Sequence, residues 1–151
     1  MKGVPLFLLL TLVCSAEVRL PAIFSDNLVL QQRSGNPIWG WAAPKEKVTL
    51  KTSWGETYSA TPGSDGRWMV VAYTPKAGTG HQITVKGSNE IVLKNVAIGE
   101  VWLCAGQSNM GWSTGNSFEA EKEAKVNLPG FRIYRSAREH WHEPLKENRD
   151  R

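Results

Sequence analysis

Ser108 is the residue whose type and surroundings point most directly to chemistry. It is the centre of the sequence Gly106-Gln107-Ser108-Asn109-Met110, which directly follows the apolar run of residues 101–105. The apolar run predicts a short strand, and Gly106 predicts a tight turn at its end. Ligands and nucleophiles gather at the carboxyl ends of strands in open α/β sheets. The pattern therefore predicts a nucleophilic serine, while the short motif alone also fits a serine that forms a turn or caps a helix.

The residues beside the serine are interpreted as supports for this turn. Gly106 and Gln107 are turn formers, and the Asn109 amide either orients the serine or bonds within the turn. Gly111 and Trp112 come next, and they fit the wall of a pocket as well as they fit packing against a sheet. This short segment is therefore the candidate catalytic turn.

A serine also needs a base, because its neutral hydroxyl is a weak nucleophile. The sequence contains three histidines, His81, His140 and His142. His140 and His142 have a spacing that suits a metal ion, but no third ligand accompanies them, so no metal site is predicted. No histidine is placed next to Ser108 by the sequence pattern.

The chain before the serine motif consists of short β-type runs separated by turns rich in Gly, Pro and Asp. Residues 48–52 alternate apolar and polar side chains, as a half-buried strand does. A spacing near ten residues is typical of a β-sandwich. We therefore expect an Ig-like or jelly-roll-like sandwich over residues 17–95. Its expected strands cover residues 28–30, 37–41, 48–52, 68–73, 81–85 and 90–93.

The pattern changes near residue 96. Residues 96–103 form a longer run that is apolar on both faces, which predicts a strand buried between helices. Asn116 and Glu119 predict a capped helix that continues to about Lys125, and residues 131–134 predict a further strand. Strand, serine turn, helix and strand make one crossover of a parallel sheet. A single crossover cannot bury both faces of its strands, so residues 96–151 are expected to be the start of an incomplete α/β domain.

The N-terminus predicts export. Lys2 precedes an apolar stretch at residues 4–13, and Cys14-Ser15-Ala16 supplies small residues for cleavage after residue 16. The apolar stretch is too short to span a bilayer. Residues 1–16 are therefore predicted to be a signal peptide of a secreted or periplasmic protein. Cleavage is favoured over lipid anchoring at Cys14, because Leu12 and Val13 are not the small residues that such anchoring sites prefer.

Composition excludes several classes of protein. A hydrophobic content of 41% and a charged content of 21% are those of a globular protein. The basic residues behind the net charge of +4 are scattered, so no nucleic-acid partner is expected. Cleavage would leave Cys104 without a disulfide partner, and its apolar surroundings predict a buried, inert thiol. Trp39 and Trp41 lie two residues apart and share one strand face, where packing is favoured over a sugar-binding platform.

Two stretches together resemble one known family. Residues 20–32 (LPAIFSDNLVLQQ) and the following residues 37–42 (PIWGWA) and Pro44 resemble the N-terminal β-domain of sialate O-acetylesterases. Residues 99–110 (GEVWLCAGQSNM) resemble the first catalytic block of that family, which is of the SGNH hydrolase class. The resemblance implies a serine esterase that removes O-acetyl groups from sialic acid or related glycans, without a metal or organic cofactor.

The resemblance also assigns roles. It implies that Ser108 is the nucleophile and that its backbone N–H is one donor of the oxyanion hole. The family takes its other oxyanion donors, a glycine and an asparagine, from later blocks, and its base from an Asp-x-x-His block. The sequence has no Asp-x-x-His, and none of its histidines matches that base. We therefore expect a fragment that is inactive alone. A secreted, non-catalytic carbohydrate-binding sandwich is the alternative, and the oligomeric state stays open.

Overall fold

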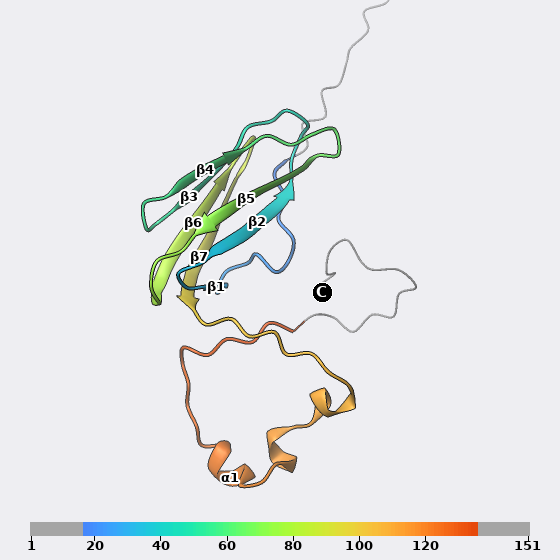
Figure 1. The fold of residues 1–151 in the computed structure, drawn as a ribbon, viewed down its shortest axis with the longest axis vertical. Coiled ribbons are helices and arrows are strands. Elements are labelled where there is room, and N and C mark those ends of the chain that lie inside the picture. Colours follow the sequence, from blue (N-terminus) through green and yellow to red (C-terminus); the bar gives the residue numbers. More distant parts are fainter. Residues whose placement is uncertain (1–16, 136–151) are drawn as a thin grey trace, which may run out of the picture.

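A computed structural model of the chain describes residues 17–135. Most of the regular structure is β (Figure 1). One sheet has five strands in the order β1-β7-β6-β3-β4, and the other pairs β2 with β5. All neighbours are antiparallel except β1 and β7, which are parallel. The strands are β1 (Val29–Gln31), β2 (Gly35–Trp41), β3 (Val48–Thr52), β4 (Thr57–Ala60), β5 (Arg67–Tyr73), β6 (Gly78–Lys86) and β7 (Glu90–Gly99).

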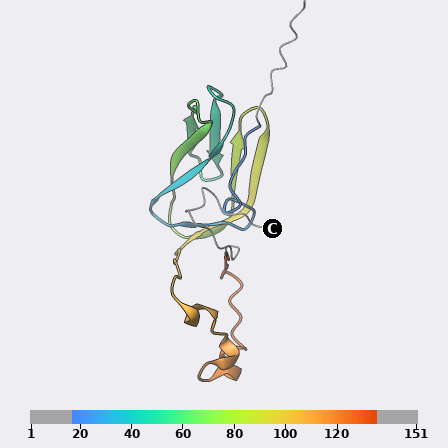
Figure 2. The ribbon, with the colours of Figure 1, turned by 90° about the vertical axis from the view of Figure 1, so that its right-hand side faces the viewer.

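One hydrophobic core lies between the two sheets. Figure 2 shows the strands of both sheets after a turn of 90° from the view of Figure 1. Along β5 every second side chain is buried, because successive residues of a strand point to opposite faces. The buried side chains of the small sheet meet those of the large one, and all belong to residues before 99. Fully buried members are Ile38, Val48, Leu50, Ile83, Val85 and Val96.

The β-rich architecture expected before residue 95 is confirmed in its coarse form. Before residue 95, strands occur in every region where the sequence pattern predicts one, and β4 is an additional strand. β7 joins two predicted elements, residues 90–93 and the start of 96–103, into one strand. It contains Asn95 with a φ of 53° and continues to Gly99, past the expected junction after residue 95.

The expected pair of tryptophans does share a strand face. The rings of Trp39 and Trp41 lie 5.3 Å apart with an interplanar angle of 75°. Phe24 contacts the Trp39 ring, while the Arg19 guanidinium lies 4.1 Å from the centre of the Trp41 ring. Both indoles thus pack against neighbouring side chains on the outer face of the small sheet.

The strand predicted across residues 96–103 is wrong beyond Gly99. Residues 101–105 have no regular structure, and the Leu103 side chain is 94% exposed. The expected strand at residues 131–134 is also absent. A strand needs a neighbouring strand to pair its backbone groups and cover its apolar faces. Within residues 17–135 no neighbouring strand lies beside either segment, so neither segment forms a strand despite its apolar sequence.

The predicted helix is shorter than expected. α1 spans Ala120–Glu123, and its N-cap is Glu119 in a left-handed conformation with a φ of 56°. Asn116 does not cap it, because Asn116 is the last residue of the 3₁₀ helix η2 (Thr114–Asn116). Cys104 is exposed, contrary to expectation, since the strand that would have buried it does not form.

Candidate active site

Ser108 begins the 3₁₀ helix η1 (Ser108–Gly111) and is exposed. The turn is closed by a hydrogen bond of 2.9 Å from the Met110 N–H to the Gln107 carbonyl oxygen. A second bond of 3.0 Å joins the Trp112 N–H to the Asn109 carbonyl oxygen. A Cβ on Gly106 would lie 3.0 Å from the Met110 Cγ, so glycine lets that side chain fold back over the turn. The serine therefore lies on a tight turn and not within a continuous strand.

The surroundings of Ser108 supply no base among residues 17–135. No side-chain hydrogen bond of Ser108, Gln107 or Asn109 occurs there, and His81 is elsewhere. It lies on β6, where its Nδ1 is 3.4 Å from the Ser53 Oγ. His140 and His142 lie outside the described residues. The same part of the chain contains no group of three His, Cys, Asp or Glu side chains able to hold a metal.

A hydrogen-bonded network holds the chain where it leaves β7 toward Ser108. Gln31 Nε2 donates to Glu100 Oε2 at 2.9 Å, and Gln32 Nε2 donates to Glu100 Oε1 at 2.6 Å. The Val101 N–H donates to Gln31 Oε1 at 2.8 Å. The two amide donors, Gln31 first, hold the pKa of Glu100 below its ordinary value of 4.5. The first residues of the segment are thus fixed to β1.

Sequence reasoning assigned no role to this network. Gln31 and Gln32 end the first stretch that resembles the known family, and Glu100 lies at the start of the second. The sequence signal that could have indicated their role is that all three lie within the two family-like stretches. The parallel pairing of β1 with β7 brings the two stretches together.

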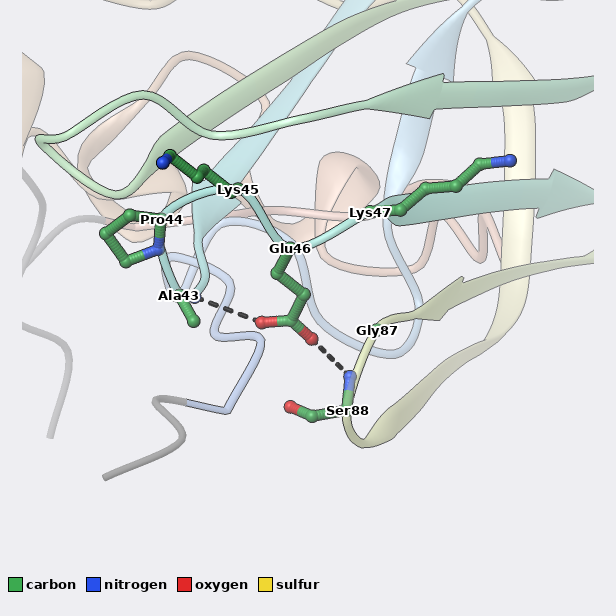
Figure 3. A pocket seen from close by; sticks show the side chains of 7 residues that line it. All are labelled: Ala43, Pro44, Lys45, Glu46, Lys47, Gly87 and Ser88. Atoms are coloured by element: carbon green, nitrogen blue, oxygen red, sulfur yellow. Dashed lines mark hydrogen bonds between the residues drawn. The ribbon is translucent and has the colours of Figure 1, made fainter. Parts of the chain in front are cut away.

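A shallow hollow of about 490 Å³ occurs at the other end of β7, lined by residues 43–47 with Gly87 and Ser88 (Figure 3). Glu46 points across it and accepts hydrogen bonds from the N–H groups of Ala43 and Ser88. Partial desolvation raises the pKa of Glu46, but the backbone donors outweigh it and the pKa is lowered. This carboxylate therefore joins two loops.

No helix in residues 17–135 is long and apolar enough to cross a membrane. The expected signal peptide and Cys14 lie outside the described residues, so export stays a prediction. Among the described residues, the candidate site consists of the Ser108 turn and the residues that hold its segment.

Comparison with known proteins shows that this chain is similar to curated sialate O-acetylesterases. The curated sialate O-acetylesterase of Mus musculus is 30% identical over 80% of this chain, and that of Homo sapiens is 28% identical over 90%. These matches span 25% and 28% of the relatives' own length, so the chain spans about a quarter of each. No protein-family model matches the chain.

A solved structure agrees with these relatives. The crystal structure of a carbohydrate acetylesterase from Xanthomonas citri has a TM-score of 0.64 and 28% sequence identity. The match covers 71% of this chain and 25% of that chain. The resemblance to sialate O-acetylesterases is confirmed: proteins of that name are homologues over most of this chain.

Proposed function

We propose that the chain is part of an exported serine esterase that removes O-acetyl groups from sialic acid or related acetylated glycans. The observation that carries the proposal is the exposed Ser108 on a tight turn, within a chain whose homologues are sialate O-acetylesterases. The acetylesterase neighbour of known structure supports the same reaction class. The expected partner is an O-acetylated carbohydrate.

The proposed domain organisation follows from where the core lies. Residues 17–95 would be an Ig-like or jelly-roll-like sandwich, and residues 96–151 the first crossover of an SGNH hydrolase domain. The closed core before residue 99 and the uncovered apolar side chains of residues 101–134 support a division of this kind, with the junction nearer Gly99 because Val96 belongs to the core. Exposed side chains such as Trp102 and Phe118 would be covered once further strands and helices of an α/β domain pack on them.

The reaction begins with attack of Ser108 Oγ on the acetyl carbonyl carbon. A base from another part of the esterase takes the hydroxyl proton and passes it to the departing sugar oxygen. The Ser108 N–H faces the oxyanion as one donor, because the first residue of a helix has no intrahelical acceptor for its N–H. Water then attacks the acetyl-serine, which releases acetate and restores the hydroxyl.

The 151-residue chain alone is expected to hydrolyse esters very slowly, because Ser108 has no base beside it among residues 17–135. Purified chain can be tested with 4-nitrophenyl acetate. Robust turnover would contradict the proposed need for a base from elsewhere.

The decisive test is Ser108→Ala in a polypeptide in which the chain continues into the remaining esterase domain. Acetate release from O-acetylated sialic acid and from 4-nitrophenyl acetate should fall about 10³-fold or more, because the variant lacks the proposed nucleophile. Ser113→Ala is the matched control, since it removes an exposed hydroxyl from the same segment. Full activity of Ser108→Ala would remove the assignment.

A non-catalytic carbohydrate-binding module is the second candidate. It is favoured by one observation: the core is closed without any residue from 100–135. Binding of acetylated glycans by a chain that ends at Arg151 in the cell, with no hydrolysis in the longer polypeptide, would support it.

Export is part of the first proposal. Cleavage after Ala16 would give a mature protein that begins at Glu17. N-terminal sequencing of the protein recovered from the periplasm or medium tests this step, and a retained Met1 would contradict it.

A further inference from the structure

The Arg132 side chain attaches the part of the chain that returns from α1 to the residues around β1 and β7. Residues 100–135 are exposed with two exceptions, Ala120 and Arg132, which are half-buried. In Figure 1 the chain leaves the end of β7, passes through α1 and comes back toward the sheets. Arg132 lies on this returning part and contacts residues near β1 and on β7.

The Arg132 guanidinium forms three hydrogen bonds. Its Nη1 donates to the carbonyl oxygens of Leu28 at 3.1 Å and of Asn95 at 2.6 Å. Its Nη2 lies 3.3 Å from Asn95 Oδ1. A guanidinium presents several donors in a fixed plane, which suits a cluster of carbonyl oxygens better than the single ammonium of lysine does.

The acceptors are arranged by the local backbone. Asn95 has a φ of 53° within β7, a conformation that asparagine tolerates better than most residues. Its side-chain amide donates to Asn27 Oδ1 at 2.7 Å, which directs its own Oδ1 away toward the guanidinium. The oxygen atoms that bind the Arg132 guanidinium therefore belong to residues on or next to the strands, and not to the returning chain.

The two ends of the Ser108 segment are held by the same pair of strands. The exit is fixed by Glu100 to Gln31, at the end of β1, and the return is fixed by Arg132 to Leu28, just before β1. Three residues along a strand span about 10 Å. The segment of residues 101–131 is thus a loop closed at its base, and closing a loop reduces the number of conformations open to the chain within it.

We propose that Arg132 is a positioning residue for Ser108: it closes the base of the loop and so limits where the serine turn can lie. This inference rests on the proposed esterase function for its catalytic consequence, whereas the anchor itself can be tested without catalysis. A displaced serine turn would lose reaction geometry while leaving sugar binding largely unchanged.

Trypsin tests the anchor in the 151-residue chain, because trypsin must bind the guanidinium that Leu28 and Asn95 already hold. Cleavage after Arg132 should be about tenfold slower than cleavage after exposed Lys125 of the same segment. Asn95→Gly permits the positive φ but removes the Oδ1 acceptor, so it should speed cleavage after Arg132. Asn116→Gly is its control. Equal cleavage after Arg132 and Lys125 in the unaltered chain would overturn the anchor.

Kinetics test the positioning in the longer polypeptide. Arg132→Ala should lower kcat about tenfold with KM within about twofold, and Arg132→Lys should recover part of the loss. Arg135→Ala, three residues further along, should change neither constant. An unchanged kcat in Arg132→Ala would overturn the positioning role even with the anchor present. Full activity of Ser108→Ala would instead remove the esterase proposal and the catalytic half of this one, while the trypsin result would still decide the anchor.

Discussion

Gln32 and Glu100 are 68 residues apart in the sequence and form a hydrogen bond of 2.6 Å between Nε2 and Oε1. The bond joins the end of the first family-like stretch to the start of the second. Gln31 donates to the other oxygen of the same carboxylate, so both oxygens of Glu100 have an amide donor. The start of the serine segment is therefore held by two glutamine side chains that come before strands β2 to β7 in the sequence.

Acid should release this network. Hydrogen bonds from Gln31 and Gln32 lower the pKa of Glu100 in the folded chain. A lowered pKa means that the stabilisation is complete above the unfolded pKa and is lost as the pH falls through the folded pKa, below 4.5. Hydrogen exchange of the Val101 amide, which Gln31 also holds, should accelerate over that range after correction for intrinsic rates. In Glu100→Gln the same amide should exchange faster at pH 7 and lose this acid dependence. An acid profile unchanged by the substitution would show that another group is responsible.

Glu46 should contribute to the stability of the loops around the hollow. Its carboxylate accepts from the N–H groups of Ala43 and Ser88, so Glu46→Ala leaves both without this acceptor. We expect the free energy of unfolding to fall by about 1–2 kcal/mol in urea titrations at pH 7. Because the folded pKa of Glu46 is lowered, the difference from the unaltered chain should vanish as the pH falls through it. Lys47→Ala is the control, and an equal loss in that variant would contradict the role of the carboxylate.

Gly40 should not tolerate a side chain. It is buried in β2, and a Cβ there would overlap the backbone carbonyl oxygen of Arg19. The backbone of Arg19 is paired with that of Trp41: the Arg19 N–H donates at 2.8 Å, and the Arg19 carbonyl accepts at 2.9 Å. Gly40→Ala should lower the free energy of unfolding by about 1–3 kcal/mol, because a paired backbone cannot move aside easily.

Gly99→Ala is the matched control for that change. Gly99 is also in a strand, and a Cβ there meets no atom within 4 Å. Urea unfolding followed by tryptophan fluorescence measures both variants. Equal stabilities of the two would show that the carbonyl of Arg19 can shift at little cost.

The strands before residue 99 could be predicted because their local pattern and their tertiary environment agree. Val48 and Leu50 are buried while Lys51 is exposed, as alternation requires. β4 was missed, although Tyr58 and Ala60 alternate with polar neighbours, because its half-buried face carries little apolar signal.

The elements after Gly99 could not be predicted in the same way. Residues 101–105 and 131–134 have apolar sequences that strands often have, but a strand is defined by its hydrogen-bonded neighbour. The sequence pattern also cannot predict the role of Arg132, because a single arginine does not indicate which carbonyl oxygens its side chain will bind in the fold. The tight turn at Ser108 was predictable from its motif, but its expected place at the end of a strand was wrong, because residues 101–105 form no strand. The groups that hold its segment depend on which strands pair.

The parallel pairing of β1 with β7 has a consequence for biosynthesis. Within residues 17–135, β1 is an edge strand that pairs with β7, the last strand of the sheet. Contacts between residues so distant in sequence form late, because a long stretch of chain must be ordered first. During translation the early residues of β1 must therefore wait, unpaired, until residues 97–99 have left the ribosome. The sheet is completed only as the serine segment begins to emerge behind it.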